Sequence, residues 1–566
     1  MKILLTAINA KYIHSNLAIY SLRAYAEEYK NQIALAEFTI NQRTEYILSE
    51  IFKKKPDVLC FSCYIWNIRF VLEVAEEFHK ICPKVPIWVG GPEVSYEVED
   101  FLKKNRFITG VMVGEGEKIF QHVCKCYVNQ NGKGLENVKG LAFLDADGHM
   151  VCKEPEMPMD LSEIPFCYDD MEDFKNKIIY YESSRGCPFR CSYCLSSIDK
   201  VLRFRNLELV KKELAFFIEK EVPQVKFVDR TFNCDHRHAM EIWRFIKEND
   251  KGITNFHFEI AADLLTDEEI AFLGTLRPGL VQLEIGVQTT NPKTIDEIHR
   301  RMDLERLKCV VQQIKAKENI HEHLDLIAGL PFEDYETFQK SFDEIYALKP
   351  EQLQLGFLKV LKGSYMFEHK EEYQVIYESN PPYEVLGTKW LPYEKMLRIK
   401  QAEEMLEVYY NSRQYPMSIK LLETEFDSAY VMFEALGQYY EEKGYAGLNH
   451  TRIGRLQILL EFVETIDAEH LELFKQAATY DIYSRENAKS RPIFASDLNE
   501  FKELTRKFCK KGKLTHLEKF DYRMPEEETV KELPKKQKES YYLLFDYEKK
   551  DALNHRAMVC EVNTKV

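Results

Sequence analysis

The stretch "ESSRGCPFRCSYCLSS", residues 182–197, places three cysteines at positions 187, 191 and 194. The spacing C-x3-C-x2-C differs from that of a zinc ribbon, which needs two close pairs of ligands, and from an isolated redox C-x2-C motif. A four-iron cluster held by only three thiolates keeps one iron open to an outside ligand. The sequence therefore predicts that Cys187, Cys191 and Cys194 hold a [4Fe-4S] cluster whose remaining iron binds a substrate or cofactor.

A structural metal site is a second interpretation of the same three cysteines. In that interpretation Cys234 or His236 would supply a distant fourth ligand. The remaining cysteines are predicted to be ordinary buried or surface thiols; they are Cys60, Cys63, Cys82, Cys124, Cys126, Cys152, Cys167, Cys309, Cys509 and Cys560.

Length and charge favour a multidomain protein that does not bind nucleic acid. A chain of 566 residues exceeds what one hydrophobic core serves, so three or four domains are expected. The net charge of −15, with Lys and Arg spread thinly along the chain, disfavours binding to the phosphate backbone of a nucleic acid. No stable nucleic-acid partner is therefore expected. The apolar run at residues 1–8 is too short for a secretory signal, and no apolar run is long enough to span a membrane. These features predict a cytoplasmic protein whose few special cysteines serve metal or redox chemistry.

Residues 1–145 alternate short apolar runs with helical patterns, which predicts a parallel sheet with helices on both faces. Such sheets bind ligands beyond the carboxyl ends of their strands. Gly90 and Gly91 lie at one such end, where they would allow close approach of a large flat ligand. Gly114 and Gly116 lie at another, where backbone N–H groups would open a helix.

The rest of the chain divides into three further parts. Residues 146–178 are polar and contain spaced prolines, as is typical of a connector. Residues 179–372 hold six apolar runs, of which all but the last precede a helical pattern, so we predict a partial barrel of βα units with its site at the carboxyl ends of the strands. Residues 380–566 are predicted to form a mainly helical domain that ends in a small strand pair, and the Lys-rich piece "KFCKKGKLTHLEKF" is interpreted as a solvated face.

The cysteine stretch resembles the signature of the radical S-adenosylmethionine (SAM) family, with Tyr193 as the aromatic residue before the last cysteine. The resemblance extends over residues 179–372. "FVDRTFN" (227–233), "FEIAADLL" (258–265), "LEIGVQTTNPKTIDEIHR" (283–300) and "LDLIAGLP" (324–331) look like later strand ends of that family, of which the first carries an acidic or small residue that lines the site. The resemblance implies SAM contacts from Glu259, Asp263, Gly286, Gln288 and Gly329.

The leading domain resembles the cobalamin-binding, flavodoxin-like domain that precedes the radical SAM core in one large subfamily. The similarity rests on "SNLAIYSLRAYAEE" (15–28), "VGGPEVS" (89–95) and "VGEGE" (113–117). Members that replace the lower cobalt ligand carry Asp-x-His-x-x-Gly, whereas this chain has "YIHSNL" at 12–17, so His14 is not predicted to bind cobalt. The resemblance implies cobalamin contacts from Ser62, Gly90, Gly91, Gly114, Glu115 and Gly116.

Together these resemblances imply an anaerobic, cobalamin-dependent radical SAM enzyme that functionalises an unactivated carbon, with methyl transfer as the preferred reaction. The helical end resembles an uncharacterised domain found in some members of the subfamily. The implied partners are a small-molecule or peptide substrate and an electron donor such as flavodoxin or ferredoxin. No catalytic acid or base is predicted, because radical abstraction needs none.

Three alternative functions stay open. One is radical rearrangement or cyclisation without methyl transfer. Another is an RNA methylthiotransferase, but that family needs three more cluster cysteines in its leading domain, and Cys60, Cys63 and Cys82 are too close together along the sequence to copy that arrangement. The last is a non-catalytic cobalamin carrier or sensor, which the intact cysteine triad opposes.

Overall fold

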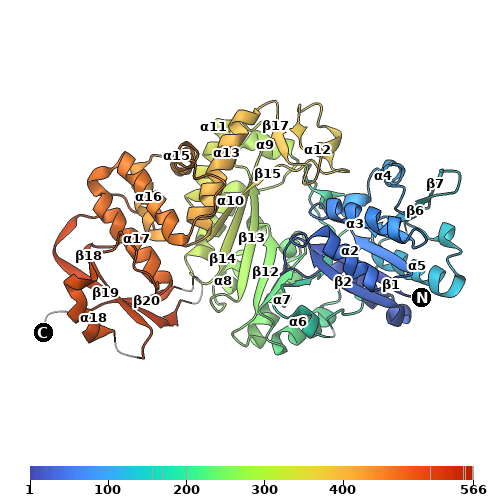
Figure 1. The fold of residues 1–566 in the computed structure, drawn as a ribbon, viewed down its shortest axis with the longest axis horizontal. Helices are drawn as coiled ribbons and strands as arrows, with labels where there is room; N and C mark the ends of the chain where they lie inside the picture. Colours follow the sequence, from blue (N-terminus) through green and yellow to red (C-terminus); the bar gives the residue numbers. More distant parts are fainter. Residues whose placement is uncertain are drawn as a thin grey trace. The chain divides into compact units, whose positions relative to one another are not determined.

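The computed structural model describes residues 1–155, 157–168, 170–198, 201–509, 512–551, 554 and 556–563 (Figure 1). It divides into two compact units. The first unit contains residues 1–284, 296–303 and 357–388, and the second contains residues 285–295, 304–356 and 389–566. Within the described part of the chain, no helix is both long and apolar enough to cross a membrane.

The first unit begins with a seven-stranded sheet in the order β2-β1-β3-β4-β5-β6-β7. The pairs β1–β2, β1–β3, β3–β4 and β4–β5 are parallel. Every residue of β1 and β3 is buried, as expected for strands covered on both faces. The strands are β1 (Ile3–Asn9), β2 (Ile33–Thr39), β3 (Val58–Ser62), β4 (Ile87–Gly90), β5 (Gly110–Met112), β6 (Leu141–Leu144) and β7 (Met150–Cys152).

This arrangement confirms the predicted flavodoxin-like fold, with one difference at the edge of the sheet. β6 runs antiparallel to β5, and β7 pairs antiparallel with β6 through a turn closed by Gly148 N and Asp145 O at 3.0 Å. The sheet therefore continues past residue 145 into the predicted connector, whose Glu156 and Asp169 lie outside the described residues. The helices of this part are α1 (Leu17–Tyr25), α2 (Thr44–Lys53), α3 (Ile68–Ile81), α4 (Val98–Lys104) and α5 (Gly116–Gln130).

The six predicted strands of the second block are all present. They form a sheet in the order β15-β14-β13-β12-β11-β8, and β8–β11 and β11–β12 are parallel. The strands are β8 (Ile179–Tyr181), β11 (Gln224–Phe227), β12 (Asn255–Ile260), β13 (Val281–Gln288), β14 (His321–Ala328) and β15 (Gln352–Phe357). The helices are α6 (Leu207–Glu219), α7 (His236–Asn249), α8 (Asp267–Leu273), α9 (Pro292–Glu297), α10 (Leu304–Lys315), α11 (Tyr335–Tyr346) and α12 (Tyr365–Glu368).

Short strand pairs accompany this sheet. β9 (Ser184–Arg185) pairs with β10 (Arg203–Phe204), and β16 (Ile376–Tyr377) pairs with β17 (Val385–Gly387). β9 leads directly into the loop with the three cysteines.

The end of the chain is mainly helical and closes with a three-stranded antiparallel sheet rather than the expected strand pair. The unpredicted strand is β18 (Thr515–Tyr522), which overlaps the Lys-rich piece interpreted as a solvated face. Leu517 and Phe520 of β18 are fully buried, so the strand has a buried face that the charged residues around it obscured in the sequence. Lys510 and Lys511 of the Lys-rich piece lie outside the described residues. The other elements are α13 (Tyr393–Met405), η9 (Leu406–Asn411), α14 (Pro416–Leu422), α15 (Ala429–Glu442), α16 (Arg452–Ile466), α17 (Leu471–Arg485), α18 (Lys502–Phe508), β19 (Lys536–Lys550) and β20 (Ala557–Glu561).

Gly91 joins two strand ends of the leading sheet. Its φ is 121°, and a Cβ added there would lie 2.4 Å from the carbonyl oxygen of Cys63. The backbones are held together by a 2.7 Å hydrogen bond from Cys63 N to Gly90 O. The protein's own packing therefore requires glycine here, so Gly91 is not by itself evidence for a ligand.

Replacing Gly91 with alanine should lower the free energy of unfolding by about 2 kcal/mol or more, because it adds both a steric clash and a disfavoured φ. Gly148→Ala is the matched control, since its φ is 83° but the nearest atom, Arg106 Nη1, is 4.0 Å from the added Cβ. That variant should lose only about 1 kcal/mol. Urea unfolding followed by circular dichroism measures both, and equal losses would contradict this account of Gly91.

Candidate functional site

The loop that carries the three cysteines is fixed by its backbone. Gly186 has a φ of 95°, and a Cβ there would lie 2.5 Å from the carbonyl oxygen of Val201. Further along, Ser192 N donates to Ile298 O at 2.9 Å, and Met366 N donates to Ser192 O at 2.9 Å. All of these residues belong to the first unit. The loop is thus attached to two distant parts of the chain at Ser192, directly after its second cysteine.

The thiols of this loop lie in a protected environment. Cys187 and Cys191 are buried and Cys194 is half-buried. Burial raises the pKa of the Cys191 thiol, and the nearby Cys194 raises it further, while the Arg300 guanidinium opposes both effects. Three soft thiol donors on one buried loop are the donor set that iron–sulfur clusters use, so the residues present fit such a cluster.

Of the two residues that the structural-metal interpretation offered as a fourth ligand, one lies near the loop. Burial raises the pKa of the half-buried Cys234 thiol to about 11, and the charge of Cys187 contributes to that shift. His236 is engaged elsewhere, because its Nδ1 lies 3.1 Å from the Glu269 carboxylate. Whether Cys234 binds the metal therefore decides between a site with three thiolate ligands and a site with four.

Arg300 is a neighbour of the cysteines that sequence analysis did not single out. Its Nη1 donates to Cys191 Sγ at 3.8 Å and to the Tyr193 hydroxyl at 3.3 Å. A guanidinium beside a thiol favours the thiolate, which is the form that binds metal. Arg300 lies 109 residues after Cys191, so no local spacing could have linked the two.

Asp229 has a structural role that the sequence did not predict. The acidic residue in "FVDRTFN" was expected to line the site, but Asp229 is fully buried and accepts hydrogen bonds from Ser183 N (2.9 Å), Ser183 Oγ (2.6 Å) and Ser184 Oγ (2.6 Å). Ser183 Oγ also lies 3.0 Å from His238 Nε2. Burial raises the pKa of Asp229 to about 6 and lowers that of His238 to about 4. This network fixes the residues that enter the cysteine loop.

The predicted SAM residues are divided between the two units. In the first unit, Glu259 lies half-buried near the carboxyl end of β12, and Asp263 accepts a 2.9 Å hydrogen bond from Asp303 N. In the second unit, Gly286 and Gln288 occupy the less buried positions of β13, and Gln288 has an unusual φ of 76°. Gly329, with a φ of 89°, follows β14. The contacts of these residues with SAM stay predictions.

The predicted cobalamin residues differ in how available they are. Ser62 ends β3, and its buried Oγ has no hydrogen-bond partner in the described part of the chain. Gly114 has a φ of 90° and nothing within 4 Å of an added Cβ. Ser62 lies at the end of β3 and Gly114 just after β5, and such strand ends are where parallel sheets bind ligands. Gly90 ends β4, whereas a Cβ on Gly116 would lie 3.0 Å from Leu22 Cδ2, so Gly116 serves helix packing.

Glu115 and His14 have protein partners in the first unit. The Glu115 carboxylate accepts from Arg203 at 2.5 Å and lies 3.4 Å from Arg185. Burial would raise the pKa of Glu115, but the hydrogen bond from Arg203 and the charge of Arg185 bring it below its usual value. His14 Nδ1 lies 2.5 Å from the Tyr180 hydroxyl, and burial lowers the His14 pKa.

Arg300→Met should raise the pKa of the Cys191 thiol, because the cation that opposes the effect of burial is lost. In the metal-free protein, alkylation of Cys191 by iodoacetamide, followed by mass spectrometry across a pH series, should then shift to higher pH. Arg301→Met is the matched control, since the adjacent Arg301 is exposed. An unchanged alkylation profile in Arg300→Met would contradict the role of Arg300.

Comparison with known families agrees with this organisation. Residues 3–124 match the family model "B12 binding domain", and residues 181–345 match "Radical SAM superfamily". The chain is a B12-binding radical SAM protein. Residues 371–558 match a family described as "Protein of unknown function (DUF4080)", so this B12-binding radical SAM protein carries a third module whose role is open.

Among curated relatives, the chain is 27% identical over 318 residues to 2-(S-pantetheinyl)-carbapenam-3-carboxylate methyltransferase of Streptantibioticus cattleyicolor, covering 50% of this chain and 44% of that protein. It is 22% identical over 340 residues to the anaerobic magnesium-protoporphyrin IX monomethyl ester cyclase of Cereibacter sphaeroides, covering 55% and 53%. The matches thus span about half the length of each relative.

A solved structure shares the fold. The cobalamin-dependent SAM radical enzyme OxsB with aqua-cobalamin bound matches with a TM-score of 0.59 at 14% identity, over 85% of this chain and 80% of that one. This likeness extends the fold assignment beyond the regions that the curated relatives cover.

Proposed function

We propose that this B12-binding radical SAM protein transfers a methyl group to an unactivated carbon, with a [4Fe-4S] cluster, SAM and cobalamin as cofactors. The observation that carries the proposal is the buried loop with Cys187, Cys191 and Cys194, held in a chain that also has a B12 binding domain. The methyltransferase named among its relatives supports the choice of methyl transfer.

The chain's own residues would prepare this chemistry. Cys187, Cys191 and Cys194 would hold the cluster, Arg300 would keep the Cys191 sulfur in its thiolate form, and Asp229 would fix the entry to the loop. When bound, the cluster supplies the electron that splits SAM into methionine and a 5′-deoxyadenosyl radical. An electron donor such as flavodoxin or ferredoxin would be required.

Radical cyclisation is a second candidate, and one observation favours it. A relative that matches 55% of this chain is named a magnesium-protoporphyrin ester cyclase. Both reactions would use the same cysteine loop and the same two leading domains, so the loop alone does not choose between them.

The methylthiotransferase interpretation finds less support. A second cluster in the leading domain would need three cysteines close together. Cys60 is buried on β3 and Cys63 is buried directly after it, whereas Cys82 follows the far end of the 14-residue α3. Such a helix is about 21 Å long, which separates Cys82 from the other two thiols.

The reconstituted protein, given SAM and a low-potential reductant without oxygen, should form 5′-deoxyadenosine, and it should form S-adenosylhomocysteine only when cobalamin is present. Mass spectrometry measures both products. 5′-Deoxyadenosine without S-adenosylhomocysteine would favour cyclisation or rearrangement over methyl transfer.

Cys191→Ala is the variant that tests the cluster, and it should lose both the iron and the 5′-deoxyadenosine. Cys309→Ala is its control, because Cys309 is an exposed thiol on α10. If Cys191→Ala still cleaved SAM, the assignment of the cluster ligands would be wrong.

A further inference from the structure

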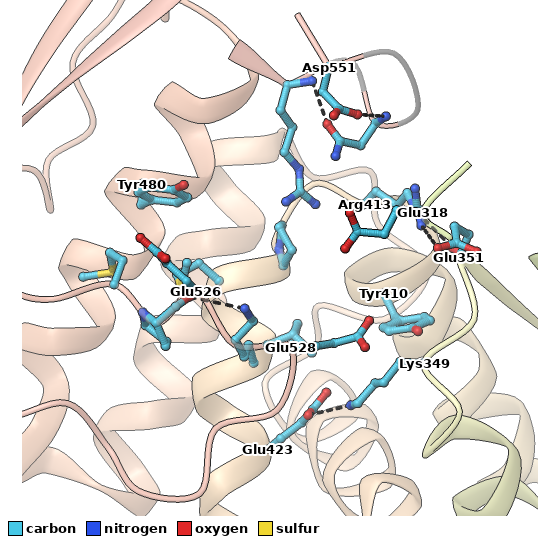
Figure 2. Close-up of a pocket in the computed structure, with 18 of the residues that line it drawn as sticks. Glu318, Lys349, Glu351, Tyr410, Arg413, Glu423, Tyr480, Glu526, Glu528 and Asp551 are labelled. Carbon is cyan, nitrogen blue, oxygen red and sulfur yellow. Dashed lines mark hydrogen bonds and ion pairs between the residues drawn. The ribbon is translucent and has the colours of Figure 1, made fainter. Parts of the chain in front are cut away.

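The second unit contains a cavity of about 1120 Å³ that the motifs of the radical SAM core do not use (Figure 2). Its walls come from segments 312–320, 347–351, 409–423 and 523–528, from Tyr480 of α17, and from seven described residues near the end of the chain: Tyr541, Leu543, Asp551, Asn554, Arg556, Val559 and Glu561. Natural ligand pockets measure roughly 300–1,000 Å³, so this cavity has room for a molecule of nucleotide size.

The cavity lies at the amino ends of two strands. Glu318 and Ile320 come just before β14, and residues 349–351 come just before β15. Gly329, where a SAM contact is predicted, follows the opposite end of β14. An eight-residue strand spans about 26 Å, so the cavity is well separated from that end.

Three lysines and arginines of the cavity are already neutralised by carboxylates. Lys349 Nζ lies 2.6 Å from Glu423, Lys315 Nζ lies 2.9 Å from Glu528, and Arg523 Nη1 lies 2.5 Å from Glu561. These pairs leave little net charge at their part of the wall.

Lys420 and Arg556, unlike these three cations, form no ion pair with a carboxylate of the described residues. Lys420 Nζ donates to the main-chain oxygens of Pro525 (3.3 Å) and Glu527 (2.6 Å). No carboxylate of the described residues lies within ion-pair distance of the half-buried Arg556 guanidinium. Burial lowers the pKa of both groups, and the charge of Arg556 lowers the pKa of Lys420 further. Carboxylates offset these shifts only in part, Asp481 for Arg556 and Glu528 for Lys420. Lys420 and Arg556 thus repel each other in a partly desolvated wall, and a bound anion would reduce this repulsion.

The remaining lining is compatible with a negatively charged ligand. The carboxylates Glu318, Glu526 and Asp551 are exposed, so solvent screens their charge. Figure 2 shows these three side chains and the Tyr480 ring among the lining of the same pocket, where the ring offers an apolar surface. Met417, Leu543 and Val559 add further apolar area.

We propose that this cavity binds a small organic anion of up to about nucleotide size, whose carboxylate or phosphate group lies against Lys420 and Arg556. Both anion contacts lie in the third module, whose function is open, although residues 312–320 and 347–351 of the cavity wall lie outside it. The proposal does not depend on the radical chemistry proposed above.

Pyrophosphate and citrate are suitable probes, each titrated into the full-length protein by isothermal calorimetry without SAM or cobalamin. At least one should bind saturably below about 10 mM; tighter binding of pyrophosphate would indicate a phosphate ligand, and tighter binding of citrate a carboxylate. Arg556→Met and Lys420→Met should each weaken that binding about tenfold, the value expected for a lost charged hydrogen bond.

Arg523→Met is the matched control, because Arg523 lines the same cavity but is exposed and paired with Glu561. It should leave the dissociation constant within about twofold. The proposal is overturned if neither probe binds, or if Arg556→Met and Lys420→Met both bind like the parent protein. Thermal unfolding without probe confirms that each variant is folded.

Discussion

The active centre proposed for this protein depends on holding three thiols together on one short loop. Thiols repel one another as they ionise, and burial adds to the cost, as the raised pKa of Cys191 shows. The protein offsets this cost locally: Arg300 places a positive charge beside Cys191, and the buried Asp229 fixes Ser183 and Ser184 just before the loop. Gly186 permits the tight path of the chain between β9 and the first cysteine.

The chain contains two α/β modules, and in each of them the strand ends are the predicted ligand sites. In the leading module, the unpartnered Ser62 hydroxyl and the open space at Gly114 are the predicted cofactor contacts that no protein group occupies in the described part of the chain. Its neighbours Gly91 and Gly116 serve packing within the protein, and Glu115 is bound by two arginines. The predicted contacts thus separate into groups available to a ligand and groups already occupied.

Features encoded locally were predictable from the sequence. The three cysteines, the six strands of the second block and the parallel leading strands all follow from spacing and apolar periodicity. Features that depend on distant partners were not predictable. Arg300 contacts Cys191 from 109 residues further along the chain, and Asp229, which was predicted to line the site, is fully buried and accepts a hydrogen bond from Ser183 N. β18 was missed because Lys and Glu side chains surround its buried Leu517 and Phe520.

The central claim is that three thiolates, and no fourth, hold a cluster with an open iron. Electron paramagnetic resonance of the reduced, reconstituted protein tests it most directly, compared with a Cys234→Ala variant because Cys234 lies near Cys187. The account predicts that SAM changes the cluster spectrum, and that Cys234→Ala has the same spectrum and iron content as the parent protein. A spectrum insensitive to SAM, together with loss of iron in Cys234→Ala, would show four protein ligands and contradict it.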